Sequence, residues 1–111
     1  MSKYSEEAQK VFNFLGTLSK ESPKIAEGFT TMHKATGVDS AISAKHKELM
    51  ALSIAISIRC EGCIACHVKG AIDAGASKDE IVETIGVAIL MSGGPATVYG
   101  NKAYEAMNEM M

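Results

Sequence analysis

Three cysteines and one histidine stand within eight consecutive positions of the sequence. They are Cys60, Cys63, Cys66 and His67, and they include every cysteine of the 111-residue chain. Cys60 and Cys63 have the C-x-x-C spacing of many redox-active dithiols, and His67 follows Cys63 by one helical turn. A thiol beside an imidazole that can take its proton is suited to nucleophilic sulfur chemistry. The pattern therefore predicts redox chemistry at this stretch.

Helical phasing separates these four residues. On a helix that begins near Cys60, the side chains of Cys60, Cys63 and His67 fall within an arc of roughly 60°. Residues three apart on a helix have Cα atoms about 5 Å apart, which a disulfide can bridge, and the helix N-terminus stabilises a thiolate. We therefore expect Cys60 and Cys63 to cycle between dithiol and disulfide. Cys66 lies outside the arc, and we expect a small buried thiol there.

A zinc site is a competing interpretation of the same residues. Zinc usually has four ligands; Cys60, Cys63 and either Cys66 or His67 supply three, and His46 is a conceivable fourth. Zinc is the less favoured interpretation because Cys66 and His67 diverge on a helix and no second C-x-x-C exists. A thioredoxin-type domain is disfavoured too, since no strand pattern precedes the dithiol.

The rest of the sequence predicts an all-α fold of about six helices, and these helices must position the cysteines and His67. The composition is 47% apolar with 5% aromatic residues and no Trp, and no strand-like alternation occurs. Caps, glycines and prolines set the expected boundaries. The expected helices run from a cap at Ser5 through Leu18, from Pro23 to Gly37, from Ser43 to Ile58, from Cys60 to Ala74, from a capping box at Ser77 to Gly93, and from Ala96 to about Glu109.

The packing of these helices follows from their apolar residues. The stripe on residues 11–18 is expected to pack, and the third helix, apolar almost all round in its second half, is expected to be central and buried. His33 is expected to be an ordinary polar-face or boundary histidine, because nothing nearby in the sequence pairs with it. Two interpretations of Glu48 stay open. It is either a solvated acid in a first turn or a partly buried carboxylate that orients His67.

Charge and hydropathy limit the class of protein. The net charge is −2 without a basic stripe, which argues against nucleic acid as a partner. The longest apolar run, Leu49 to Ile58, is too short to span a membrane, and the first residues lack the apolar segment of a signal peptide. We expect one cytoplasmic domain over residues 1–111, with no membrane partner. So short a chain leaves little room for a cavity of its own, so a homo-oligomer that binds substrate between subunits is expected.

A longer pattern resembles a known family. From about residue 43 to residue 93, the chain is similar to the carboxymuconolactone decarboxylase and alkyl hydroperoxidase D superfamily. The matching positions are Glu48, then eleven intervening residues and Cys60-x-x-Cys63, then three intervening residues and His67, followed by Ala74-Gly75-Ala76-Ser77-x-x-Glu80-Ile81. The resemblance implies an all-α alkyl hydroperoxidase D-like fold, in which a central helix hairpin carries the C-x-x-C, and assembly into trimers or hexamers.

The resemblance also implies an activity, a peroxidase that reduces small hydroperoxides without flavin, haem or any other cofactor. By analogy, Cys63 attacks after losing its proton through His67 and Glu48, and Cys60 resolves the sulfenic acid into a disulfide. An external dithiol or disulfide reductase then restores the pair. The chain departs from the hydroperoxidase branch in being shorter and in having Gly62 where that branch often has a histidine.

Two other functions remain open. A cofactor-free lyase of the carboxymuconolactone decarboxylase type needs only proton transfer from His67 or Glu48, although that branch usually lacks the dithiol. A non-enzymatic oligomer that uses the cysteines for redox or metal binding is the third possibility.

Overall fold

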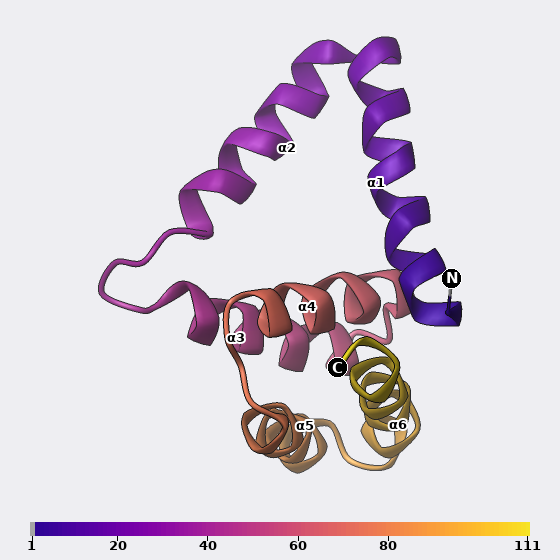
Figure 1. Cartoon of the computed structure of the whole chain (residues 1–111), viewed down its shortest axis with the longest axis vertical. Coiled ribbons are helices and arrows are strands. Elements are labelled where there is room, and N and C mark those ends of the chain that lie inside the picture. Colours follow the sequence, from indigo (N-terminus) through magenta and orange to yellow (C-terminus); the bar gives the residue numbers. More distant parts are fainter. Residues whose placement is uncertain (1) are drawn as a thin grey trace.

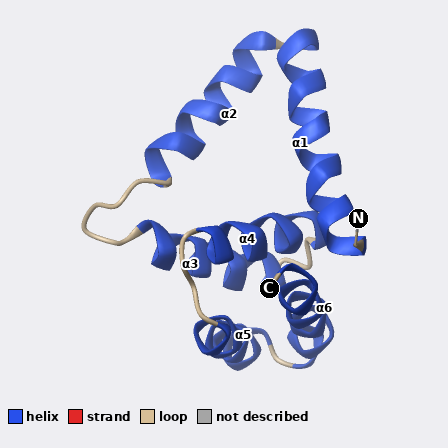
Figure 2. Cartoon of the chain, in the orientation of Figure 1, coloured by secondary structure: helices blue, strands red, loops and turns tan. Residues whose placement is uncertain are grey.

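Six helices form the part of the chain that the computed structural model describes, residues 2–111, and no strand occurs in that range (Figures 1 and 2). This confirms the all-α prediction. None of these helices is long and apolar enough to cross a membrane. The helices are α1 (Lys3–Glu21), α2 (Pro23–Thr36), α3 (Ala44–Ser57), α4 (Glu61–Asp73), α5 (Lys78–Ser92) and α6 (Gly94–Met110).

The helices form two regions of different character. Helices α3 to α6 pack on one another as a four-helix block, with α3 and α4 side by side (Figure 1). Helices α1 and α2 form an arm that extends from this block and returns to it (Figure 1). The arm is held mainly through α1, which packs on α4 and α6, whereas α2 packs chiefly on α1.

The hydrophobic core lies almost wholly in the block. Its largest fully buried side chains are Leu52, Ile56, Ile64, Val68, Ile81 and Met107. The arm buries only Tyr4, Ala8 and Ala26. The prediction that the apolar stripe of the first helix packs is therefore wrong for Phe14, which is 60% exposed. The stripe is amphipathic as expected, but the arm stands off from the block, so part of its apolar surface has nothing to pack against.

Helix α3 is central but not buried all round. Leu49, Leu52, Ala55 and Ile56 are buried against its neighbours. By contrast, Met50, Ile54 and Ile58 are more than half exposed, so the prediction of a fully buried helix is wrong on this face. Within residues 2–111, no helix packs closely enough on this face of α3 to bury it.

Local signals set most helix ends as expected. Ser43 caps α3, Ser77 and Glu80 form the capping box of α5, and Gly75 has a left-handed φ of 94° after α4. The first helix begins earlier than predicted, at Lys3, because Ser2 takes the N-cap position and its hydroxyl contacts that of Ser5. Helix α6 begins at Gly94, with a proline in its first turn.

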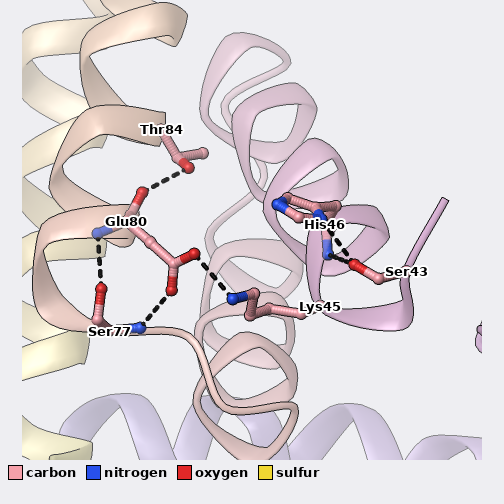
Figure 3. Close-up of polar contacts among 6 residues, drawn as sticks. All are labelled: Ser43, Lys45, His46, Ser77, Glu80 and Thr84. Carbon is pink, nitrogen blue, oxygen red and sulfur yellow. Dashed lines mark hydrogen bonds and ion pairs between the residues drawn. The ribbon is translucent and has the colours of Figure 1, made fainter.

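A polar joint ties α5 to the first turn of α3 (Figure 3). Lys45 Nζ lies 2.9 Å from Glu80 Oε2, while Glu80 Oε1 accepts the Ser77 N–H at 2.9 Å. The Ser77 N–H and then the Lys45 ammonium lower the pKa of Glu80 to about 2. The joint holds the beginning of α3, the helix that carries Glu48.

Candidate active site

A tight turn folds α4 back along α3. Three residues, 58–60, join the two helices, and Arg59 has a φ of 61°, in the left-handed region that non-glycine residues seldom occupy. The Cys60 N–H donates to the Ala55 carbonyl at 3.0 Å and closes the turn. The predicted hairpin is thus present, and it brings the cysteines of α4 beside the helix that carries Glu48.

Cys60 and Cys63 lie at the beginning of α4. Cys60 is the N-cap residue, with an extended backbone, and its Sγ accepts the Cys63 N–H at 3.2 Å. The two residues form a disulfide with a Cα–Cα separation of 5.2 Å. Both side chains are half-buried. After reduction, the helix N-terminus would stabilise a thiolate at this position, because its free N–H groups and its dipole favour negative charge.

His67 and Glu48 form a pair across the hairpin. His67 Nδ1 lies 2.8 Å from Glu48 Oε2, and the two side chains are 28% and 22% exposed. Of the two interpretations of Glu48, the structure therefore shows the partly buried carboxylate. A carboxylate on Nδ1 fixes the imidazole orientation and leaves Nε2 as the atom that can accept a proton. His67 lies one turn beyond Cys63 on the same helix.

Gly70 makes room for this pair. A Cβ atom at Gly70 would lie 2.5 Å from Glu48 Oε2 and 2.7 Å from Glu48 Cδ, so the carboxyl group rests directly on this part of α4. The sequence interpretation missed Gly70. The available signal was a glycine inside a helical pattern, which often has a packing reason.

A cavity of about 310 Å³ brings these groups together with the arm. Glu48, Cys60, Cys63 and His67 line one side of it. Residues of the arm line the other side: Val11, Phe12, Leu15, Phe29 and His33. The expectation that so short a chain leaves little room for a cavity of its own is therefore wrong, because the arm stands off from α4 and supplies a second wall. A larger cavity of about 420 Å³ between α1, α4 and α6 contains no cysteine.

Two further predicted residues have different surroundings. Cys66 is half-buried rather than buried and lines the same cavity; burial, and then the nearby Glu48 carboxylate, raise the pKa of its thiol. His46 Nδ1 contacts the Ser43 hydroxyl at 2.6 Å. Across residues 2–111, no group of three or more His, Cys, Asp or Glu side chains is arranged to hold a metal ion. Nothing in the described chain therefore supports the zinc interpretation.

Comparisons with known proteins agree with this architecture. The profile of the carboxymuconolactone decarboxylase family matches residues 23–106. Uncharacterized protein 4 in cox locus of Paracoccus denitrificans is 35% identical over 86% of this chain and 86% of its own length. An uncharacterized protein of Cupriavidus necator is 30% identical over 84% of this chain and 85% of its own.

A solved structure extends the agreement to the whole fold. The apo form of a carboxymuconolactone decarboxylase family protein from Legionella pneumophila superposes with a TM-score of 0.94. It is 34% identical to this chain, and the match covers 99% of this chain and 98% of that one. The family profile, the relatives and the fold lead to one conclusion. The chain belongs to the carboxymuconolactone decarboxylase family.

Proposed function

We propose that this protein is a cysteine-based peroxidase, a dithiol oxidoreductase that reduces small hydroperoxides through Cys63 and Cys60. One observation carries the proposal: a disulfide-forming pair and the His67–Glu48 pair line the same cavity. The pair can store two electrons, the imidazole can accept a proton, and the cavity can hold a small organic molecule.

The proposed reaction begins with the reduced pair. His67 takes the proton of Cys63, and the thiolate attacks the terminal oxygen of the hydroperoxide. An S–O bond forms, the O–O bond breaks, and Cys63 becomes a sulfenic acid; the leaving alkoxide takes up one proton, equal in number to the one that His67 removed from Cys63, and departs as the alcohol. The Cys60 thiol then attacks the Cys63 sulfur and releases water, which gives the disulfide. An external dithiol, such as those of the cytoplasm, returns two electrons and two protons to the pair.

The lactone decarboxylase chemistry in the family name is less well supported for this chain. That reaction would need only proton transfer by His67 or Glu48, and it gives the neighbouring disulfide no role. The presence of the Cys60–Cys63 pair in the cavity therefore favours the peroxidase.

Trapping of the sulfenic acid tests the proposal. Reduced protein is treated with one equivalent of hydroperoxide and dimedone, and the labelled peptide is identified by mass spectrometry. We expect Cys63→Ser to abolish peroxide consumption and Cys60→Ser to leave a sulfenic acid on Cys63 that dimedone traps. Cys66→Ser is the matched control and should react like the unmodified protein. A label on Cys66, or none, would contradict the assignment.

We also infer that the chain forms a homo-oligomer, a trimer or a hexamer. Its support is exposed apolar surface: Ile25 and Met32 on α2 are 63% and 69% exposed, and Leu90 and Met91 on α5 are each 79% exposed. A helix such as α2, which buries a single alanine, gains little stability from packing within its own chain. Sedimentation equilibrium should give three or six times the 11.7 kDa chain mass; a monomer would refute the inference.

A further inference from the structure

His33 borders the reactive groups from the opposite wall. It lies in the last turn of α2 and lines the 310 Å³ cavity together with Cys63 and His67. A second cavity of about 360 Å³, on the α3 side, is also lined by His33, Glu48 and His67. The sequence alone favoured an ordinary polar-face or boundary histidine. The tertiary structure leaves His33 exposed on α2 and places it beside both cavities that border the Glu48–His67 pair.

The arm wall of the cysteine cavity is otherwise apolar. Its other members are Val11, Phe12, Leu15 and Phe29, so His33 is the one side chain of that wall that can exchange a proton. The ring of Phe29 lies beside the His33 imidazole, with the ring centroids 5.9 Å apart. Within residues 2–111, the imidazole makes no hydrogen bond and no ion pair, so it is available to a bound molecule.

The charged groups of the opposite wall are already engaged. Glu48 is paired with His67, and Lys69 Nζ lies 2.7 Å from Asp73 Oδ2. In the reduced protein that meets the peroxide, Cys63 is the proposed nucleophile and Cys60 the proposed resolving thiol, and burial raises the pKa of the Cys66 thiol. With His67 assigned to the proton of Cys63, His33 is the histidine of this cavity that the cysteine chemistry leaves unused.

The geometry of peroxide reduction needs a proton on that side. Attack at an oxygen is in line, so the leaving alkoxide departs on the side of the terminal oxygen away from the Cys63 sulfur. Cys63 and His67 belong to α4, and the arm forms the facing wall, so a hydroperoxide bound between these walls with its terminal oxygen at Cys63 would develop its alkoxide toward the arm. An alkoxide is a strong base, and a positioned acid that protonates it as it forms accelerates the step.

We propose that His33 is this general acid. The proposal rests on the peroxidase function and adds a catalytic residue to it. The Cys63 thiolate bonds to the terminal oxygen of the hydroperoxide, the O–O bond breaks, and the leaving oxygen takes the proton of the His33 imidazolium. The products are the Cys63 sulfenic acid, a neutral alcohol and a neutral imidazole, so atoms and charge balance.

The test compares two leaving groups in one variant. Reduced full-length protein is mixed with cumene hydroperoxide, which releases a strongly basic alkoxide, or with peracetic acid, which releases a carboxylate that needs no proton. The second-order rate constant of thiol loss is measured for each. We expect His33→Gln to slow the reaction with cumene hydroperoxide about a hundredfold and to leave the reaction with peracetic acid unchanged.

The control is Lys34→Gln, which removes a charge from the same turn of α2 at a residue that lines a different cavity. It should alter neither rate. An equal loss of both rates in His33→Gln would show a structural effect of the arm and overturn the proposal, and so would two unchanged rates. If the unmodified protein oxidises with neither peroxide, the peroxidase function itself fails; an active protein with no leaving-group dependence refutes His33 alone.

Discussion

The four-helix block and the arm have similar helices but differ in how their residues are held. The block buries large side chains such as Leu52, Ile64 and Met107 completely, whereas α2 buries only Ala26 over its whole length. Because helices in proteins owe most of their stability to tertiary packing, the block is the stable part and the arm the weakly held part. The two walls of the candidate site therefore come from regions of unequal stability.

This difference separates two kinds of site residue. The groups proposed for sulfur chemistry, Glu48, Cys60, Cys63 and His67, all belong to the α3–α4 hairpin inside the block. The arm supplies apolar lining and His33. Proton transfer between a thiol and an imidazole needs fixed geometry, which a packed hairpin provides. The apolar residues of the arm wall can tolerate more movement and can differ without disturbing the cysteine pair, whereas the general-acid role proposed for His33 requires the arm to be held in place.

The largest effect should come from a cavity made in the block. Ile64→Ala removes a fully buried side chain from α4 and should lower the free energy of unfolding by about 2–5 kcal/mol. Met32→Ala is its counterpart on the arm and removes a side chain that is 69% exposed. In the isolated chain, it should change the free energy of unfolding by less than about 0.5 kcal/mol. Urea unfolding followed by circular dichroism measures both.

Repeating the Met32→Ala measurement at high and low protein concentration separates the arm from an interface. If the loss of unfolding free energy in Met32→Ala grows with protein concentration, Met32 lies between subunits. Equal losses of unfolding free energy in Ile64→Ala and Met32→Ala in the isolated chain would contradict the distinction between block and arm.

A smaller effect is expected where α3 and α4 touch. Gly70→Ala would push the Glu48 carboxyl group away from its position beside His67, because the new Cβ lies 2.5 Å from Oε2. A weakened hydrogen bond of this kind is worth about 0.5–1.5 kcal/mol, so alkylation of the reduced protein should slow roughly two- to tenfold at neutral pH. Iodoacetamide kinetics with mass-spectrometric detection of Cys63 measure this.

Gly86→Ala is the matched control, since a Cβ there has no atom within 4 Å and α5 contributes nothing to the site. It should leave alkylation unchanged and stabilise the helix by up to about 1 kcal/mol. If Cys63 is alkylated as fast in Gly70→Ala as in the unmodified protein, the position of Glu48 does not affect the reactivity of the Cys63 thiol.

The smallest effect should appear at the polar joint between α3 and α5. The folded-state pKa of Glu80 is about 2, below its usual 4.5, so its contribution to stability is present above pH 4.5 and is lost as the pH falls toward 2. Glu80→Gln should therefore lower Tm at pH 7 but have a shrinking effect between pH 4.5 and pH 2. Thermal unfolding across this range tests the prediction, with Glu83→Gln on the same helix as control. A pH-independent difference would show that the charge does not matter.

The candidate site could be predicted in part from spacing. Cys63 and His67 share α4, where the helical repeat places them on one face whatever surrounds the helix, and Cys60 is the N-cap residue directly before it. Glu48 is nineteen residues from His67, and only the turn at Arg59 and the packing of α3 on α4 decide that they meet. Gly70 and His33 gave weaker signals, because the significance of each depends on a neighbour that is distant in the sequence.

The sequence by itself determined the helices, their caps and the reactive face of α4, since these depend on neighbours within one or two turns. Only the tertiary structure decided which apolar faces stay exposed, that the arm stands off from α4, and that a cavity lies between them. A stripe such as residues 11–18 has the same amphipathic pattern whether it meets a core, a cavity or another subunit. The pattern records only that the side chains are apolar, and the long-range packing of the arm determines what they face.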